Sequence, residues 1–336
     1  MTEIRLRDSG SHGTQDCRSA DEPLVVVVQG PTASGKTELA HRLADVFPME
    51  IISADSRQVW SGLDIGTAKP PVEERHRYRY HGVDICTPDR RLSAGEFAHA
   101  AWQWIADIHR RGHIPLVVGG SGLYVRAIVE GLFEQPGDIS PTIRSELQYR
   151  LARDGRDALY EELARIDPES AARYSDRNPR RLLRALEFYY THGIPLSLAQ
   201  RQHRIEPPPM HVVRLTLLPN REHLYRRIEH RTTTMWRSGL LDEVRRLLDS
   251  GYQPTAPAFE TIGYAEAIAV IEGRMTLPDA IEHTALRTRH YAKRQYTWLR
   301  HATDCGTVFP SFGSDVFAAA CTTIESARTT FIEQRP

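Results

Sequence analysis

The segment from Gly30 to Thr37 reads GPTASGKT and matches the pattern G-x-x-x-x-G-K-[ST] in full. It directly follows the apolar run from Leu24 to Val28 and precedes a stretch of helical character, which is the context that this pattern requires. In such a loop, backbone N–H groups converge on phosphate oxygens, the lysine neutralises the terminal phosphate, and the hydroxyl can bind Mg²⁺. The pattern predicts a diphosphate or triphosphate site without specifying ATP. Its residues are Gly30, Pro31, Thr32, Ala33, Ser34, Gly35, Lys36 and Thr37.

A carboxylate follows the next predicted strand. Met49 to Ser53 has the pattern of a buried strand, and Asp55 comes just after it in the segment Ser53 to Gln58. Near the phosphate loop, a carboxylate can ligate Mg²⁺ indirectly or act as a general base. An aspartate that simply opens a turn is an alternative interpretation. The residue pattern alone leaves the choice open.

Arginines gather on two predicted helices. Arg180, Arg181 and Arg184 lie in the first turns of one helix, and Arg227 and Arg231 lie four residues apart on one face of another. A solvated surface is the more common role for such clusters. A binding role for Arg231 needs support from outside the pattern.

Basic and aromatic residues alternate between Thr284 and His301, a segment with no acidic residue. This composition is typical of a nucleic-acid surface, although aromatics at helical spacing also form cores. We favour RNA contact and leave core packing open. The loop from Asp64 to Pro70 contains a glycine, a hydroxyl and Lys69. This composition is a weak indication of contact with phosphate. The residues of the basic segment are Arg287, Arg289, Tyr291, Lys293, Arg294, Tyr296, Trp298 and Arg300.

The elements that position these residues alternate between strand and helix. Further strands are predicted at Pro115 to Val118 and at Val212 to Leu218, with helices between them. This alternation predicts an α/β fold with a doubly wound parallel sheet, like that of P-loop NTPases, and an inserted helical subdomain. Gly30, Asp55 and Gly119 all fall at the carboxyl ends of strands, where such sheets bind ligands.

Composition limits the class of protein. The 336 residues hold equal numbers of basic and acidic side chains, 43 of each, and the four cysteines include no C-x-x-C pair. These features disfavour a disulfide framework and a zinc site. The apolar runs are far shorter than the roughly 20 residues of a membrane-spanning helix, and residues 1–22 lack the apolar core of a signal peptide. We therefore expect a cytoplasmic protein without a membrane partner.

Taken in order, these segments resemble the tRNA dimethylallyltransferase (isopentenyltransferase) family from Gly30 to about Arg300. The likeness rests on a series of motifs in this order, whereas a phosphate loop alone is generic. The motifs are GPTASGKT at 30–37, DSRQ at 55–58, DIGTAKP at 64–70, VGGSGLY at 118–124, RRLLRALE at 180–187, IGY at 262–264 and AKRQYTWLR at 292–300.

The resemblance implies transfer of a dimethylallyl group from dimethylallyl diphosphate to the exocyclic amine of the adenosine 3′-adjacent to the anticodon of tRNA. It implies that Asp55 is the general base, that Lys36, Thr37 and Mg²⁺ bind the diphosphate, with Thr37 as metal ligand, and that Arg231 contacts the same group. Ser121 would lie beside the acceptor adenosine, although the family usually has Thr there. The implied tRNA contacts are Asp55, Ser56, Arg57, Gln58, Ser121, Arg144, Arg180, Arg181, Leu182, Leu183, Arg184, Glu260, Thr261, Ile262, Gly263, Tyr264 and Ala265.

The same resemblance sets the expected organisation and partners. We expect a disordered extension at 1–22, a phosphate-loop core at 23–135 and 205–312 with the tRNA-contacting helices in its second part, a helical insertion at 136–204, and a tail at 313–336. The expected partner is the anticodon stem-loop of tRNA, bound by a monomer. Trp60 replaces a more usual Tyr, so no role is assigned to it. The family's C-terminal zinc finger, found in larger eukaryotic relatives, is absent, which indicates the bacterial type.

Two alternatives stay open at this point. A small-metabolite kinase that uses ATP would have the same phosphate loop and could also carry a helical acceptor domain. A non-catalytic RNA-binding protein with a degenerate nucleotide site is less compatible with the intact Lys36, Thr37 and Asp55.

Overall fold

The structure, a computed structural model, describes residues 22–133, 140–302, 305–310 and 313–333. The predicted extension at 1–22 thus lies outside the described residues except for Glu22. In the described part of the chain, no helix is both long and apolar enough to span a membrane.

A six-stranded parallel sheet forms the centre of the molecule, in the order β3-β2-β4-β1-β7-β8. Strand β1 is buried along its whole length, as expected of an all-apolar strand covered on both faces. The α/β fold with a parallel sheet is confirmed, and the four predicted strands agree with the observed ones to within one residue at each end. The strands are β1 (Leu24–Gln29), β2 (Met49–Ser53), β3 (Tyr80–His81), β4 (Ile114–Gly119), β7 (His211–Leu217) and β8 (Thr307–Phe309).

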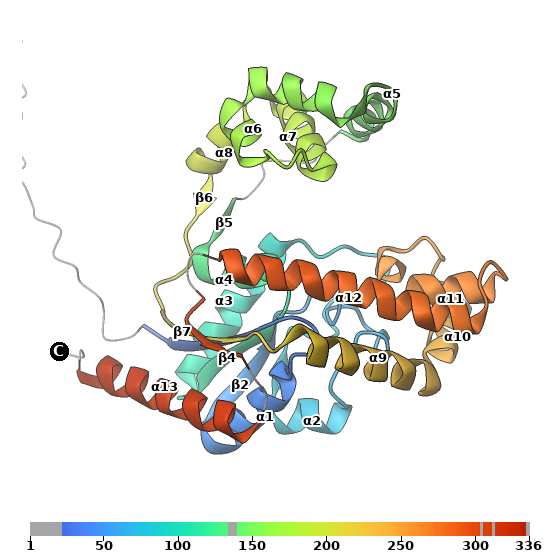
Figure 1. Cartoon of the computed structure of the whole chain (residues 1–336). Helices are drawn as coiled ribbons and strands as arrows, with labels where there is room; N and C mark the ends of the chain where they lie inside the picture. The colour runs from blue at the N-terminus through green and yellow to red at the C-terminus, as the bar shows by residue number, and fades with distance from the viewer. Residues whose placement is uncertain (1–21, 134–139, 303–304, 311–312, 334–336) are drawn as a thin grey trace, which may run out of the picture.

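Helices cover both faces of this sheet (Figure 1). Val25 and Val27 pack into one apolar cluster with α3 and α4, whereas Val26 and Val28 pack into the other with α1 and α13. The side chains of one strand thus alternate between two cores. The helices flanking the sheet are α1 (Lys36–Val46), α2 (Val72–Arg77), α3 (Ala94–Arg110), α4 (Gly122–Glu130) and α13 (Ser314–Glu333).

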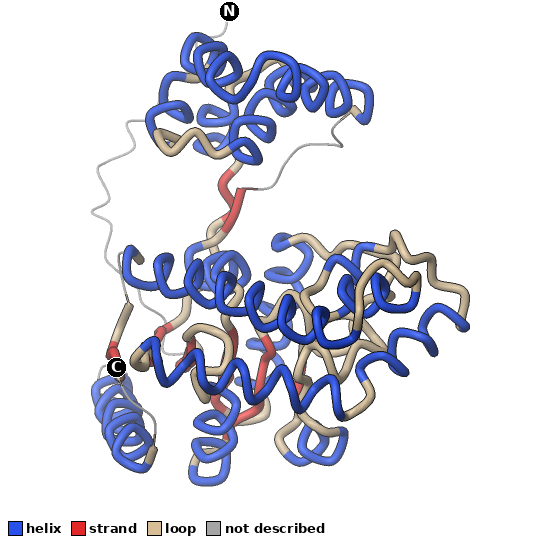
Figure 2. Tube along the Cα trace, turned by 45° about the vertical axis from the view of Figure 1, so that its right-hand side comes forward, coloured by secondary structure: helices blue, strands red, loops and turns tan. Residues whose placement is uncertain are grey.

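Four helices form a separate unit that stands above the sheet (Figures 1 and 2). They have an apolar cluster of their own, and a short antiparallel pair, β5 (Leu132–Phe133) and β6 (Arg204–Ile205), leads into and out of it. Gly155, at φ 81°, interrupts the first helix. The helices are α5 (Pro141–Ile166), α6 (Pro168–Arg173), α7 (Pro179–His192) and α8 (Leu196–Gln202).

A last group of helices lies across the carboxyl edge of the sheet (Figure 1). The longest of them, α12, packs on α9, α11 and α4, so it lies beside the loops that follow β1 and β4. This arrangement brings helices from the last third of the chain to the predicted ligand edge. The elements are α9 (Arg221–Arg237), α10 (Leu240–Asp249), the 3₁₀ helix η1 (Pro257–Glu260), α11 (Tyr264–Ile271) and α12 (Leu277–His301).

Candidate active site

The phosphate loop joins β1 to the first turn of α1. Gly35 caps the helix at φ 84°, a left-handed conformation that glycine adopts without strain. Gly30 lies so close to the neighbouring strand that a Cβ atom there would lie 2.7 Å from the carbonyl oxygen of Leu217. The amino group of Lys36 turns back over the loop and donates to the carbonyl oxygen of Pro31 at 2.7 Å. The N-terminus of α1, which carries positive electrostatic potential, therefore faces the phosphate loop.

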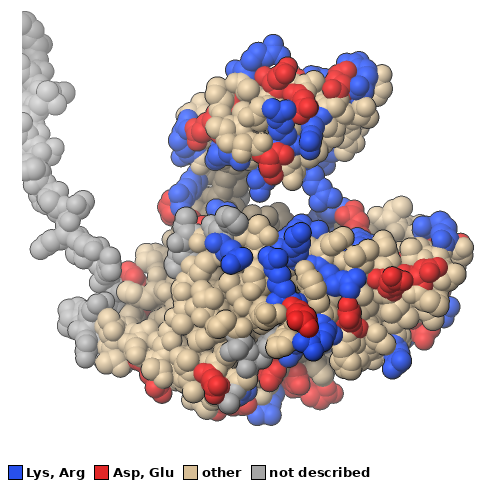
Figure 3. All heavy atoms as spheres, in the orientation of Figure 1, with Lys and Arg blue, Asp and Glu red and all other residues tan. Residues whose placement is uncertain are grey.

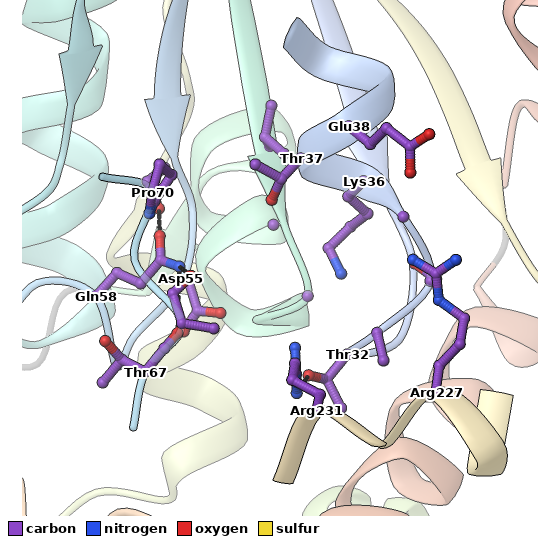
Figure 4. A pocket seen from close by; sticks show the side chains of 18 of the residues that line it. Thr32, Lys36, Thr37, Glu38, Asp55, Gln58, Thr67, Pro70, Arg227 and Arg231 are labelled. Carbon is purple, nitrogen blue, oxygen red and sulfur yellow. Dashed lines mark hydrogen bonds between the residues drawn. The ribbon is translucent and has the colours of Figure 1, made fainter. Parts of the chain in front are cut away.

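A cavity of about 750 Å³ opens in front of this loop (Figure 4). Its walls come from the phosphate loop, the segment after β2, the end of β4, the helix α9 and one residue of α12. Lys36 and Asp55 point into it from different walls, and Arg231 reaches it from α9 (Figure 4). The volume is within the usual range for small-molecule sites. The predicted cations and the predicted base therefore share one cavity.

Two cations of the cavity, Lys36 and Arg231, are buried. Burial lowers the pKa of Lys36 from 10.5 to about 8, with nearby Asp55 opposing the shift and Arg231 adding to it. Burial also lowers the pKa of Arg231, again against the attraction of Asp55. Removing charged groups from water is costly, so a bound anion that pairs with both would be favoured.

This shift predicts that affinity for diphosphate depends on the charge of Lys36. Below its pKa of about 8 the lysine is charged and ready to bind an anion, whereas above it binding must be accompanied by proton uptake. Affinity for inorganic diphosphate should therefore fall as pH rises, by up to about tenfold for each pH unit above the pKa. Calorimetric titration between about pH 7 and pH 9.5 measures this.

The control for this titration is Lys36→Gln, which has no amino group to titrate. Its remaining pH dependence reports the titration of diphosphate itself and is subtracted. An identical pH dependence in both proteins would show that Lys36 does not titrate in this range.

Asp55 is held by its own turn at the end of β2. Its carboxylate Oδ1 accepts the backbone N–H of Arg57 at 2.9 Å, and its carbonyl oxygen accepts the backbone N–H of Gln58 at 3.2 Å. The side chain of Gln58 bonds to Ser53 and to the carbonyl oxygens of Thr67 and Ala68. The aspartate thus does open a turn, and the same turn fixes its carboxylate at the cavity.

Ser121 connects the loop after β4 to the aspartate loop. The Oγ atom of Ser121 accepts the backbone N–H of Ser56 at 2.9 Å and donates to the Oγ of Ser56 at 3.1 Å. Ser121 is only 9% exposed, and its neighbours Gly119 and Gly120 line the cavity. A substrate would therefore have to reach Ser121 from the cavity. The two serines bring the sequence neighbour of Asp55 against the start of α4.

In the loop from Asp64 to Pro70, Lys69 is not placed to make the phosphate contact that the sequence suggested. Lys69 is buried, and its amino group donates to the carbonyl oxygen of Trp60 and to Asp84, both at 2.5 Å. It also pairs with Asp64 at 3.0 Å. A lysine that is buried and paired with two carboxylates is not available to bind a phosphate. The loop still borders the cavity through Thr67, Ala68 and Pro70.

The basic segment on α12 divides into paired and exposed side chains. Arg287 pairs with Glu266 at 2.6 Å, and Arg289 pairs with Glu229 at 2.5 Å. Figure 3 shows Lys and Arg side chains gathered on this face of the core, below the helical unit. The exposed basic residues of α12 in this segment are Lys293, Arg294 and Arg300.

Two aromatic residues of the same segment, Tyr296 and Trp298, serve the fold. The hydroxyl of Tyr296 donates to the carbonyl oxygens of Leu218 and Pro219 at 3.1 Å. Trp298 packs so closely on the start of α4 that a Cβ on Gly122 would lie 2.6 Å from its ring. These two rings are therefore packing residues, and the nucleic-acid prediction rests mainly on the exposed cations.

The predicted contacts in the helical unit lie mostly on its surface. Asn178 caps α7, and Arg180, Arg181 and Arg184 are exposed there. Arg144, on α5, bonds to Glu187 at 3.1 Å. The neighbouring leucines differ from them, because Leu182 is completely buried in the core of the unit and Leu183 packs against that core.

The predicted contacts at 260–265 form the turn between η1 and α11. Glu260 is exposed and pairs with Arg91, but Thr261 is buried. Tyr264 is also fully buried, and its hydroxyl donates to Glu243 and accepts the backbone N–H of Gly66 at 3.1 Å. The tyrosine side chain thus supports the core, and only the exposed part of this turn is accessible to a partner.

The residues present are compatible with a phosphate-bound magnesium ion. Thr37 lines the cavity in the first turn of α1, and Asp55 lines it from the opposite loop. Across the described ranges, no group of three or more His, Cys, Asp or Glu side chains could hold a metal by itself. Magnesium commonly takes one or two protein ligands, with phosphate oxygens and water completing its coordination, so such a cluster is not required.

Some cavity residues are given no role by the sequence analysis. Arg226, Arg227, His230 and Thr234 line the cavity from α9, and Gln295 lines it from α12. The spacing of the arginines with Arg231 was visible, but it did not distinguish a cavity wall from a solvated surface. A single glutamine among basic residues has no pattern that would indicate a buried side chain.

Comparison with known proteins identifies the family of the chain. Residues 58–302 match the family described as IPP transferase. A tRNA dimethylallyltransferase of Geobacter metallireducens is 44% identical over 283 residues, which cover 84% of this chain and 91% of that protein. A tRNA dimethylallyltransferase of Myxococcus xanthus is 44% identical over 290 residues, covering 86% and 93%.

Solved structures give the same result. The full-length tRNA isopentenylpyrophosphate transferase of Bacillus halodurans has a TM-score of 0.65 and 34% identity, covering 92% of this chain and 99% of that one. A eukaryotic dimethylallyltransferase acting on tRNA has a TM-score of 0.72 and 28% identity, covering 94% and 80%. Since the family match covers most of the chain and the relatives align along most of their length, the chain belongs to the IPP transferase family.

Proposed function

We propose that the protein transfers a dimethylallyl group from dimethylallyl diphosphate to the exocyclic amine of the adenosine 3′-adjacent to the anticodon in tRNA, releasing diphosphate. The observation that carries this proposal is the cavity in which Lys36, Arg231 and Asp55 meet. The relatives named tRNA dimethylallyltransferase support the choice of reaction.

The cations of the cavity would bind the leaving group. As the allylic carbon–oxygen bond breaks, negative charge gathers on the diphosphate. Lys36, Arg231 and the amides at the start of α1 would stabilise that charge where it develops. Because these cations are already positioned by the fold, little reorganisation is needed during the reaction.

Asp55 would take the proton from the acceptor. The adenine amine is a poor nucleophile because its lone pair is delocalised into the ring. In the proposed step a carbon–nitrogen bond forms, the carbon–oxygen bond to diphosphate breaks, and the amine proton passes to the Asp55 carboxylate. The adenine must leave its base stack to reach the cavity, at a cost of a few kcal/mol by analogy with base-flipping enzymes.

Thr37 would provide the protein ligand for Mg²⁺, with the remaining ligands supplied by diphosphate oxygens and water. The ion adds positive charge beside the leaving group. We also propose that the enzyme acts as a monomer.

The test is a single-turnover reaction without any nucleoside triphosphate. Dimethylallyl diphosphate, Mg²⁺ and unmodified tRNA should give prenylated adenosine and inorganic diphosphate. A kinase would instead need ATP and would transfer its terminal phosphoryl group. Strict dependence on ATP with formation of ADP would contradict the proposal.

The exposed cations of α12 are proposed to contact tRNA phosphates. Replacing both Lys293 and Arg294 with Ala should flatten the salt dependence of tRNA binding, by up to about two units of the log–log slope. Binding of dimethylallyl diphosphate should barely change. The measurement is tRNA affinity over a range of salt concentrations.

A double Ala substitution of Arg77 and Arg110 is the matched control, because these side chains are 66% and 76% exposed on α2 and α3. The control should keep the slope of the unmodified protein. An unchanged slope in the Lys293 and Arg294 variant would place these residues outside the tRNA interface.

A further inference from the structure

Gln295, on α12, is buried, although the basic residues next to it in the sequence are exposed. Gln295 is 7% exposed, whereas Lys293 and Arg294, which precede it, are exposed. The helix thus presents cations outward and turns Gln295 toward the carboxyl edge of the sheet. A buried amide needs partners for its oxygen and its nitrogen, because an unmade hydrogen bond in the interior is costly.

Both ends of the Gln295 amide have backbone partners. Its Oε1 atom accepts the backbone N–H of Thr32, in the phosphate loop, at 2.8 Å. Its Nε2 atom donates to the carbonyl oxygen of Gly120, in the loop after β4, also at 2.8 Å. A single side chain therefore ties three segments that are far apart in the sequence.

Each partner belongs to a different half of the proposed active site. On the diphosphate side, the hydroxyl of Thr32 accepts Nη2 of Arg231 at 2.5 Å. On the acceptor side, Gly120 precedes Ser121, whose Oγ binds the backbone N–H of Ser56, next to Asp55. The amide of Gln295 thus lies between the residues that hold the leaving group and those that hold the base.

The fit around this amide is close. A Cβ atom on Gly120 would lie 2.5 Å from Nε2 of Gln295 and 2.9 Å from the carbonyl oxygen of Gly30. One turn further along α12, Trp298 packs on Gly122. With glycines at both points, the helix and the loop approach too closely for another side chain to be inserted. This contact therefore adds to the pairing of β1, β4 and β2 in setting the distance between the two halves of the site.

We infer that Gln295 is a positioning residue that aligns the diphosphate half of the site with the half that carries Asp55. This inference rests on the proposed prenyl transfer. In that reaction the amine must approach the allylic carbon while the diphosphate leaves, and a misplacement of about 1 Å can cost on the order of a hundredfold in rate. Although Gln295 also borders the cavity, its amide is engaged by Thr32 and Gly120, so we assign its effect to the placement of those two segments.

The chemistry of the amide suggests a variant with a pH-dependent defect. Gln295→Glu keeps an acceptor for the N–H of Thr32, but an ionised carboxylate has no donor for the carbonyl oxygen of Gly120. When protonated, the same group has both an acceptor and a donor. The Glu variant should regain both hydrogen bonds at low pH. Gln295→Met has a similar size and lacks both groups at every pH.

The experiment compares single-turnover prenyl transfer by the whole chain at several pH values, with Gln103→Glu as the matched control. Gln103 is exposed on α3, so this change adds the same charge without removing a buried contact. At about pH 8, Gln295→Glu should be slower by on the order of a hundredfold, with tRNA affinity within about twofold of normal. Its rate relative to the unmodified protein should recover as pH falls toward about 6, while Gln295→Met stays slow.

Circular dichroism sets the folded fraction to which each rate is normalised. If the Met variant does not fold, the pH dependence of the Glu variant relative to the unmodified protein decides the question. Gln295→Asn, which has the same amide on a shorter side chain, then takes the place of the Met variant. Unchanged rates, or a loss in the Glu variant that low pH does not relieve, would overturn the role of Gln295. Failure of the unmodified protein to transfer a prenyl group would overturn the proposed function instead.

Discussion

Replacing Asp55 with Asn is expected to lower the single-turnover rate of prenyl transfer by about a hundredfold or more. The amide keeps the size of the side chain and an oxygen that can accept the N–H of Arg57, as Asp55 Oδ1 does at 2.9 Å. It cannot take a proton from the adenine amine. The loss should therefore appear in the chemical step, with tRNA affinity nearly intact.

The change also acts on the cations of the cavity. Asp55 raises the pKa of both Lys36 and Arg231, against the effect of burial. Without that carboxylate the amino group should lose its proton at a lower pH, so binding of diphosphate should be measured alongside the rate. Asp89→Asn, at an exposed position, is the control and should have no effect. Near-normal turnover by a folded Asp55→Asn protein would remove Asp55 from the mechanism.

Replacing Arg231 with Gln is expected to lower kcat/KM for dimethylallyl diphosphate by about a hundredfold to a thousandfold. Arg231 is held by the hydroxyl of Thr32, and its Nε atom is buried with no hydrogen-bond partner among the described residues. A guanidinium held in this way can bind two phosphate oxygens in a fixed geometry. Gln has no charge to offset that of the leaving group.

The control for this prediction is Arg226, which lies five residues before Arg231 on the same helix. Arg226 also lines the cavity from α9, but its side chain is 63% exposed and pairs with Glu222 across one helical turn. Such pairs contribute little in water, so Arg226→Gln should change kcat/KM only slightly. Steady-state kinetics with saturating tRNA compare the two variants. Equal effects at both positions would mean that the cavity attracts diphosphate by its general charge, without a specific contact by Arg231.

The parts of the fold and site that the sequence predicts are those with strong local patterns. The β-branched run of β1 can only be a buried strand, and the glycines that follow it allow the turn into α1. Because the strands are parallel, the phosphate loop and Asp55 had to lie at the same edge of the sheet.

Other features depend on contacts that a linear pattern does not contain. Lys69 resembles a phosphate ligand until Asp84 and Asp64 are placed beside it. Tyr264 has a polar group, yet Glu243 and the backbone of Gly66 satisfy it inside the core. In each case a distant partner changes the role of the residue. Such pairs are set by tertiary packing and leave no local signal.

Short or weakly amphipathic elements were missed for a related reason. β5 and β6 have two residues each, and α13 has a run of small and polar residues in which Val316, Ala320 and Ile324 are buried. These buried positions are four residues apart, a spacing that fits a helix but is too sparse to identify one. The helix α13 becomes stable because the sheet and α1 provide a surface on which to pack.

The narrow connection to the helical unit has a consequence for how such enzymes diversify. Leu132 pairs with Ile205 and Phe133 pairs with Arg204, so the chain leaves and re-enters the core at neighbouring points, like the ends of a hairpin. Everything between those points can change length or sequence without moving a strand of the sheet. The helical unit can therefore vary independently of the sheet. Selection can reshape its arginine-bearing surface for a different RNA while the catalytic cavity stays as it is.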